Sequence, residues 1–160
     1  MSRRVFYSFD YERDCWRAAM VRNMGVVKGS QLASDNRWET MKGSDAAIRR
    51  WIDSQLRGRS CTIVLIGAET ANRRWVQYEI EQSWQRGKGL LGIRIHRLLD
   101  QDQQTTDAGP DPFSIVKLPD GRSLSSLVQT YDPPGKTGRQ VYMHISRHLE
   151  RWIEAAIAAR

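Results

Sequence analysis

The chain has 160 residues, of which 40% are hydrophobic and 27% are charged, as in a soluble globular protein rather than a disordered one. Lys and Arg (25) outnumber Asp and Glu (18), and the net charge of +7 suits phosphates or another polyanionic partner. The arginines are scattered and no nucleic-acid-binding motif accompanies them, so we expect solvated helix faces and no nucleic acid partner.

The apolar runs and the cysteines indicate a cytoplasmic protein without membrane segments. The longest apolar runs, CTIVLIG and AAIAA, are too short to cross a bilayer, and the N-terminus lacks the pattern of a signal peptide. Cys15 and Cys61 form no C-x-x-C motif and are too few for a disulfide scaffold, so we expect free thiols. We expect one domain over residues 1–160, which is long enough for a single core.

The first half of the chain predicts a strand and two helices. RRVFYSF at residues 3–9 indicates a first strand, and a helix follows from Asp10 to about Met24. We expect Cys15, Trp16, Ala19, Met20 and Asn23 to lie near one face of this helix. Residues 25–43 are mostly polar and predict a loop with at most a short strand, GVV. Ser44 is a candidate N-cap for a helix over DAAIRRWIDSQL, with apolar residues at helical spacing.

The second half alternates in the same way. CTIVLIG at 61–67 predicts a strand buried on both faces, and LLGIRIH at 90–96 predicts another. A helix lies between them, a turn-rich insertion covers about 100–137 with room for a strand at FSIVKL, and a helix covers about 140–159. This alternation predicts an α/β fold with a central parallel sheet between layers of helices. Ligands bind beyond the carboxyl ends of such strands, near Ser8 and the loop after Gly67.

The helix from Arg74 to Arg86 carries a candidate reactive carboxylate. Val76, Ile80 and Trp84 form its apolar stripe at about 100° per residue, while Trp75, Tyr78, Glu79, Gln82 and Arg86 lie off it. Large aromatic residues are unusual on a solvated face. They either cover a neighbouring segment or line a pocket beside Glu79.

Four segments resemble TIR domains. WVQYE at 75–79 resembles the W-C-x-x-E element, whose glutamate is catalytic in TIR enzymes that cleave NAD⁺. RRVFYSFDYERD, CTIVLIGAETANRRW and GLLGIRIH resemble the first strand with its loop, the strand before the glutamate helix, and the next strand. RVFYSFDYERDCWRAAMVRN resembles the TIR-like proteins of bacterial Thoeris antiviral defence systems. The resemblance covers roughly residues 3–97 and implies a flavodoxin-like, three-layer fold. Arg73 departs from the family, which commonly has a small hydroxyl residue there.

The resemblance implies an enzyme that cleaves the nicotinamide–ribose bond of NAD⁺, with NAD⁺ as substrate and no cofactor or metal. Glu79 is then the catalytic residue. The Thoeris branch implies cyclisation to a cyclic ADP-ribose isomer, sensed by a separate effector protein, whereas capture by water gives linear ADP-ribose. A homo-oligomer or a phage-derived trigger is a further expected partner. The alternative is a non-catalytic module for protein–protein interaction and assembly.

Seven residues are candidate substrate contacts, each with a structural alternative. Main-chain N–H groups near Ser8 and Asp10 face a ligand, or Asp10 caps its helix. Phe9 stacks on a substrate ring or lies in the core. Trp38, beside Asn36 and Arg37, closes over the substrate or belongs to an exposed turn. Asp45 is a site acid or a first-turn partner of the helix dipole. Trp75 and Tyr78 shape the pocket or hold the helix.

Two histidines, His144 and His148, stand four residues apart on the expected last helix. No H-E-x-x-H pattern surrounds them, so we expect no zinc site there.

Overall fold

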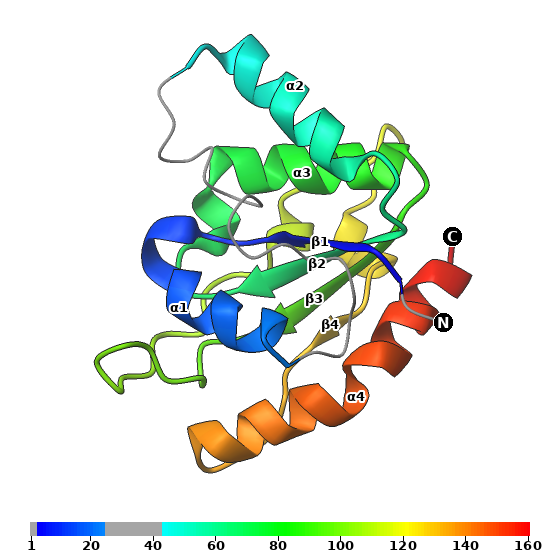
Figure 1. The fold of residues 1–160 in the computed structure, drawn as a ribbon. Coiled ribbons are helices and arrows are strands. Elements are labelled where there is room, and N and C mark those ends of the chain that lie inside the picture. The colour runs from blue at the N-terminus through cyan, green and yellow to red at the C-terminus, as the bar shows by residue number, and fades with distance from the viewer. Residues whose placement is uncertain (1–2, 25–42) are drawn as a thin grey trace.

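A computed structural model describes residues 3–24 and 43–160 (Figure 1). The expected short strand at 25–27 and the candidate loop residues Asn36, Arg37 and Trp38 lie outside these ranges.

The centre of the fold is a parallel sheet. Its four described strands are β1 (Val5–Ser8), β2 (Cys61–Ile66), β3 (Gly89–Arg94) and β4 (Thr130–Tyr131), hydrogen-bonded in that order. All three pairings are parallel. Every residue of β1 and β2 is buried, as a sheet covered on both faces requires.

Helices cover both faces of the sheet (Figure 1). One face packs against α1 (Tyr11–Arg22) and α4 (Gly138–Ala158). The other packs against α2 (Asp45–Leu56) and α3 (Arg74–Gln85). The three-layer, flavodoxin-like α/β prediction is therefore confirmed.

Strand residues alternate between the two layers, as the pleat of a strand dictates. Val5 and Tyr7 of β1 join the cluster under α1 and α4, whereas Phe6 joins the cluster under α2. Val64 and Ile66 of β2 pack against α3. Ser8 therefore lies on the side of the sheet that α3 covers.

The α2 prediction is confirmed to the residue. The hydroxyl of Ser44 accepts a hydrogen bond from the Ala47 N–H at 3.2 Å, and the helix then covers Asp45–Leu56. Ile52 and Leu56 are fully buried.

The face of α1 that the sequence singled out is not the buried one. Asp14, Arg17, Ala18 and Val21 are buried, whereas Cys15 is exposed and Trp16 is 52% exposed. The apolar pattern misled because an ion pair, Asp14 with Arg17, occupies part of the buried face.

The segment from 100 to 137 contains little regular structure, as expected. The strand expected at 113–118 does not form; the short 3-10 helix η3 (Pro112–Ser114) begins there instead. A second 3-10 helix, η4 (Leu124–Ser126), and the short strand β4 follow. Phe113 and Leu124 are buried against the α3 face of the sheet. No helix within 3–24 and 43–160 is long and apolar enough to cross a membrane.

Candidate functional site

A buried serine–glutamate contact joins β1 to α3. The Ser8 hydroxyl donates a hydrogen bond of 2.7 Å to Oε1 of Glu79, and both side chains are fully buried. Ser8 is the last residue of β1, so this contact lies at the carboxyl edge of the sheet, where open α/β folds bind ligands. Two of the predicted site residues, 71 positions apart in the chain, thus meet.

Glu79 lies on the sheet-facing side of α3. The sequence placed it outside the apolar stripe of this helix, and the structure corrects that prediction. The buried residues of this helix are Val76, Glu79, Ile80 and Ser83. Ser83 Oγ lies 2.7 Å from Thr62 Oγ1 of β2 and donates to the Glu79 carbonyl at 2.7 Å. The buried face is therefore half polar, and a stripe defined by apolar residues alone misses its polar half.

Asp10 follows β1 and is fully buried. It occupies the N-cap position of α1, yet its side chain makes no capping hydrogen bond. Its carboxylate lies 3.4 Å from Nε of Arg73 and 3.6 Å from Nε of Arg13. Arg73, where the family commonly has a small hydroxyl residue, is the N-cap of α3 and also pairs with Glu12 at 3.6 Å. These charges link the start of α1 to the start of the helix that carries Glu79.

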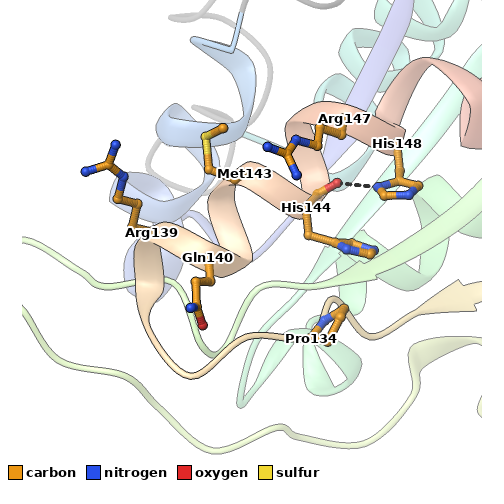
Figure 2. Close-up of a pocket in the computed structure, with 7 residues that line it drawn as sticks. All are labelled: Pro134, Arg139, Gln140, Met143, His144, Arg147 and His148. Carbon is orange, nitrogen blue, oxygen red and sulfur yellow. Dashed lines mark hydrogen bonds between the residues drawn. The ribbon is translucent and has the colours of Figure 1, made fainter.

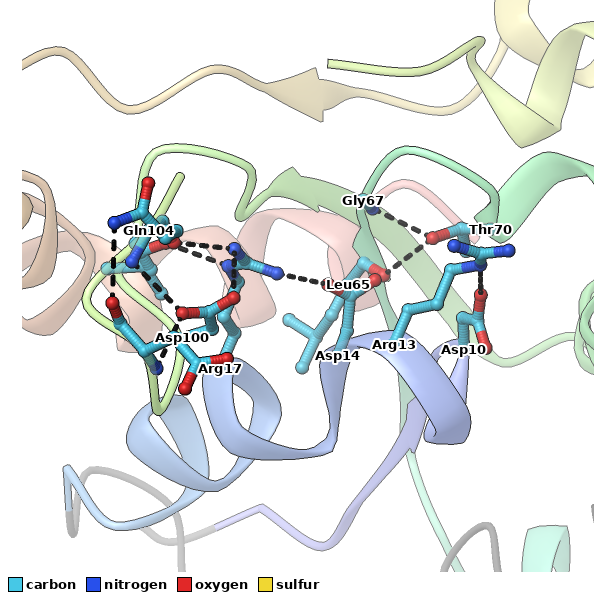
Figure 3. Close-up of polar contacts among 11 residues, drawn as sticks. Asp10, Arg13, Asp14, Arg17, Leu65, Gly67, Thr70, Asp100 and Gln104 are labelled. Atoms are coloured by element: carbon cyan, nitrogen blue, oxygen red, sulfur yellow. Dashed lines mark hydrogen bonds and ion pairs between the residues drawn. The ribbon is translucent and has the colours of Figure 1, made fainter. Parts of the chain in front are cut away.

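Arg17 fixes the loop after β3 to α1 (Figure 3). Its buried guanidinium donates to the carbonyls of Leu98 and Gln104, each at 2.8 Å, and to Oδ1 of Asp14 at 2.9 Å. Burial raises the pKa of Asp14 despite the opposing effect of Arg17. The Asp100 carboxylate lies 3.6 Å from Arg17.

Two glycines let the loops at this edge approach closely. A Cβ on Gly67 would collide with the Asp14 carboxylate, whose Cγ would lie 2.8 Å away. Gly109 has a φ of +69°, and a Cβ there would meet the carbonyl oxygens of Gly67 and Ala68. Arg94, at the end of β3, donates to the carbonyls of Ala108 and Gly109 at 2.9 Å each. The carboxyl ends of β2 and β3 are thus tightly bound to the start of the insertion.

Trp75 and Tyr78 face α2. Their rings meet edge to face with centroids 5.7 Å apart, and both pack against the cluster of Phe6, Ile52 and Leu56. The Tyr78 hydroxyl donates to Oδ1 of Asp53 in α2 at 3.1 Å, and burial together with this hydrogen bond raises the pKa of Tyr78. Of the two alternatives, this geometry is that of residues that hold the helix. A substrate contact by either ring stays a prediction.

The other predicted contacts are dispersed. Phe9 is buried in the cluster under α1 and α4, on the opposite side of the sheet from Glu79. Asp45 lies in the first turn of α2 and pairs with Arg74 Nη2 at 2.6 Å, both side chains being more than half exposed. This pair places Asp45 near the first turn of α3. Trp38 is outside the described residues.

Sequence reasoning missed the buried arginine and the acid it pairs with. Arg17 and Asp14 stand three residues apart on one helix, a spacing typical of surface ion pairs, and nothing in the sequence marks this pair as buried. Among residues 3–24 and 43–160, no group of three or more His, Cys, Asp or Glu side chains could hold a metal ion.

Comparison with known proteins agrees with the resemblance seen in the motifs. Residues 6–100 match the family described as "Thoeris protein ThsB, TIR-like domain". A protein of Bacillus cereus (strain MSX-D12), named "Putative cyclic ADP-D-ribose synthase ThsB1", is 41% identical over 122 residues. The alignment covers 72% of this chain and 64% of that relative, so the chain spans about two thirds or less of the relative's length.

The matched region contains β2, α3, β3 and all of β1 except Val5, together with the Ser8–Glu79 contact and the bonds from Arg17 to Asp14 and Leu98. The chain therefore belongs to the family of ThsB proteins of Thoeris systems, as a member with their TIR-like domain.

Proposed function

We propose that this protein cleaves the nicotinamide–ribose bond of NAD⁺ and cyclises the product to a cyclic ADP-ribose isomer. The isomer serves as an antiphage signal that a separate effector protein senses. The name of the Bacillus cereus relative, a putative cyclic ADP-D-ribose synthase, supports the cyclisation. The observation that carries the catalytic part is the hydrogen bond from Ser8 to the buried carboxylate of Glu79.

The chemistry needs only one carboxylate. Most glycosidases use two, because the departing sugar oxygen must be protonated by an acid. In NAD⁺ the ring nitrogen is already cationic. When its bond to the ribose breaks, the bonding electron pair neutralises the ring and nicotinamide leaves without a proton. The remaining ribosyl cation needs stabilisation by a nearby negative charge, which Glu79 supplies. A nucleophilic group of the same molecule then bonds to the cation, and one proton is released.

The hydroxyl of Ser8 acts as a positioning group. A hydrogen bond from the hydroxyl holds the carboxylate in one orientation and restricts its rotation. Ser8 approaches from the end of β1 and Glu79 from a helix packed on the sheet, so rigid elements hold both partners. Burial places the carboxylate in a medium of low dielectric constant, where its attraction for a developing cation is strongest.

The remaining substrate contacts lie at the same carboxyl edge of the sheet. We assign the surroundings of Asp10 and Asp45 to the ribose hydroxyls of the substrate, because carboxylates accept hydrogen bonds from hydroxyl groups and both acids flank the start of α3. Trp75 and Tyr78 support the site by holding α3 against α2.

Two serine variants test the role assigned to Ser8. Ser8→Ala removes the hydrogen bond to the Glu79 carboxylate, and we expect the kcat for NAD⁺ to fall about tenfold or more while KM changes little. Ser83→Ala is the matched control. Ser83 is a buried serine on α3 that bonds Thr62 and the main-chain carbonyl of Glu79, so this variant leaves the hydrogen bond to the Glu79 carboxylate in place. It should cost similar stability in urea unfolding and leave kcat near the wild-type value.

If both serine variants lost kcat equally, the Ser8 contact would support the fold and would have no specific role in the reaction. An interaction and assembly module, the alternative function, predicts no NAD⁺ turnover in any variant. It also predicts unchanged phage defence after Glu79→Gln, provided that the variant folds.

A further inference from the structure

A second candidate binding site lies on α4 (Figure 2). A hollow of about 350 Å³ is lined by Pro134, Arg139, Gln140, Met143, His144, Arg147 and His148. Its volume is at the lower end of the range of small-molecule sites. Six of the seven residues belong to α4, which covers the opposite face of the sheet from α3. The hollow, called here the α4 pocket, therefore plays no part in the site proposed for NAD⁺ cleavage.

The lining of the α4 pocket is positive and rich in donors. Arg139 and Arg147 contribute two permanent charges, and no carboxylate is among the residues that line it. The side-chain oxygen of Gln140 already accepts a hydrogen bond of 2.6 Å from the Lys136 N–H, so its amide group offers N–H donors. A ligand that satisfies these groups must bring acceptors and negative charge.

The histidines give the pocket a flat wall. His144 and His148 stack with ring centroids 4.1 Å apart, and Nδ1 of His148 lies 2.7 Å from the His144 carbonyl, to which it donates. The Trp152 ring centroid lies 5.6 Å from that of His148 and 5.8 Å from that of His144, and the Tyr131 ring stacks on Trp152 at 4.2 Å. These contacts fix the plane of the His144 ring within an aromatic cluster that reaches into the core. A planar ring can stack on such a platform.

We propose that the α4 pocket binds a small phosphorylated ligand of the nucleotide class. Its phosphates pair with Arg139 and Arg147, and its base stacks against His144. Guanidinium groups recognise phosphate through paired N–H donors, and stacking on aromatic rings is tolerant of the identity of the base. The size of the hollow favours a mononucleotide over a longer polymer.

Imidazole proton resonances of the whole protein give a local readout, because the chain has three histidines and only two line the pocket. Titration with ADP is expected to shift the signals of His144 and His148 saturably and to leave His96 unchanged. Adenosine, which lacks phosphate, should bind at least tenfold more weakly than ADP. Inorganic phosphate should shift both signals, but it should not saturate them at the concentration at which ADP does. Single His→Gln variants assign the three signals.

Arg147→Ala should weaken the ADP-induced shift at least tenfold, since it removes one charge-assisted pair with phosphate. Arg50→Ala is the control, because Arg50 is an exposed arginine on α2 and its loss lowers the net charge equally. Glu79→Gln should not alter the shifts, which separates this site from the proposed catalytic one. Unshifted His144 and His148 signals, or equal weakening by Arg50→Ala, would overturn the proposal. So would a single-stranded oligonucleotide that displaces ADP with a steep salt dependence, since it would identify a polynucleotide surface instead.

Discussion

Replacing Arg17 with alanine should destabilise the fold strongly, because Arg17 is a buried cation that joins α1 to the loop after β3. Its side chain is 3% exposed and donates three hydrogen bonds of 2.8 to 2.9 Å. The substitution leaves two main-chain carbonyls without this donor and leaves the buried Asp14 carboxylate without its nearest cation. Removing one partner of a buried ion pair costs about 3–5 kcal/mol. We expect a loss of about 4 kcal/mol in the free energy of unfolding.

Urea unfolding followed by tryptophan fluorescence measures this loss, since the chain has six tryptophans. For a domain of this size the same loss lowers Tm by about 8–16 °C. Arg50→Ala, on the exposed face of α2, is the matched control and should change stability by less than about 0.5 kcal/mol. A loss below about 1 kcal/mol for Arg17→Ala would contradict this expectation, because it would mean that solvent replaces the guanidinium without penalty.

Three further predictions concern the same region and the thiols. Gly67→Ala should cost about 1–3 kcal/mol in urea unfolding, since its Cβ collides with the Asp14 carboxylate, whereas Gly43→Ala meets only an ordinary contact at 3.9 Å. Burial raises the pKa of Asp14 above its ordinary 3.8, so the stability of the wild type relative to Asp14→Asn should be greatest below that value. This difference should fall as pH rises through the raised pKa; a difference that grows with pH in urea titrations would contradict the sign. Burial raises the pKa of Cys61 to about 12, so iodoacetamide should label exposed Cys15 alone in the native protein and both thiols after unfolding, as mass spectrometry can count.

The elements that the sequence predicted well are those in which local signals agree with tertiary packing. The α2 boundaries follow from the Ser44 cap and from apolar spacing that ends at Leu56. The strand at 61–66 follows from an unbroken apolar run that only a doubly covered strand can bury. Strand β4 has two residues, too few to leave a pattern, and forms because β3 offers it a paired edge.

The sequence predicted which residues belong to the candidate site, but it did not predict how they contact one another. Ser8 and Glu79 were singled out separately, and their contact depends on how α3 crosses the sheet, which no local pattern encodes. The burial of Asp14 and Arg17 depends on carbonyls near residues 98–104 that are distant in sequence. Charged residues on a helix predict a solvated face unless such distant acceptors exist.

Glu79→Gln tests whether the carboxylate of Glu79 drives NAD⁺ cleavage, because the amide keeps the shape of the side chain and removes its charge. At about 4 Å and an effective dielectric constant of about 20, a carboxylate stabilises a unit positive charge by about 4 kcal/mol. Losing this stabilisation slows the reaction by about 10³-fold.

The direct measurement is mass spectrometry of nucleotides from phage-challenged cells that express the wild type or Glu79→Gln. We expect a cyclic ADP-ribose isomer with the wild type and none above background with a folded Glu79→Gln. Unchanged NAD⁺ and no new nucleotide in either strain, with both proteins folded and phage defence intact, would contradict it.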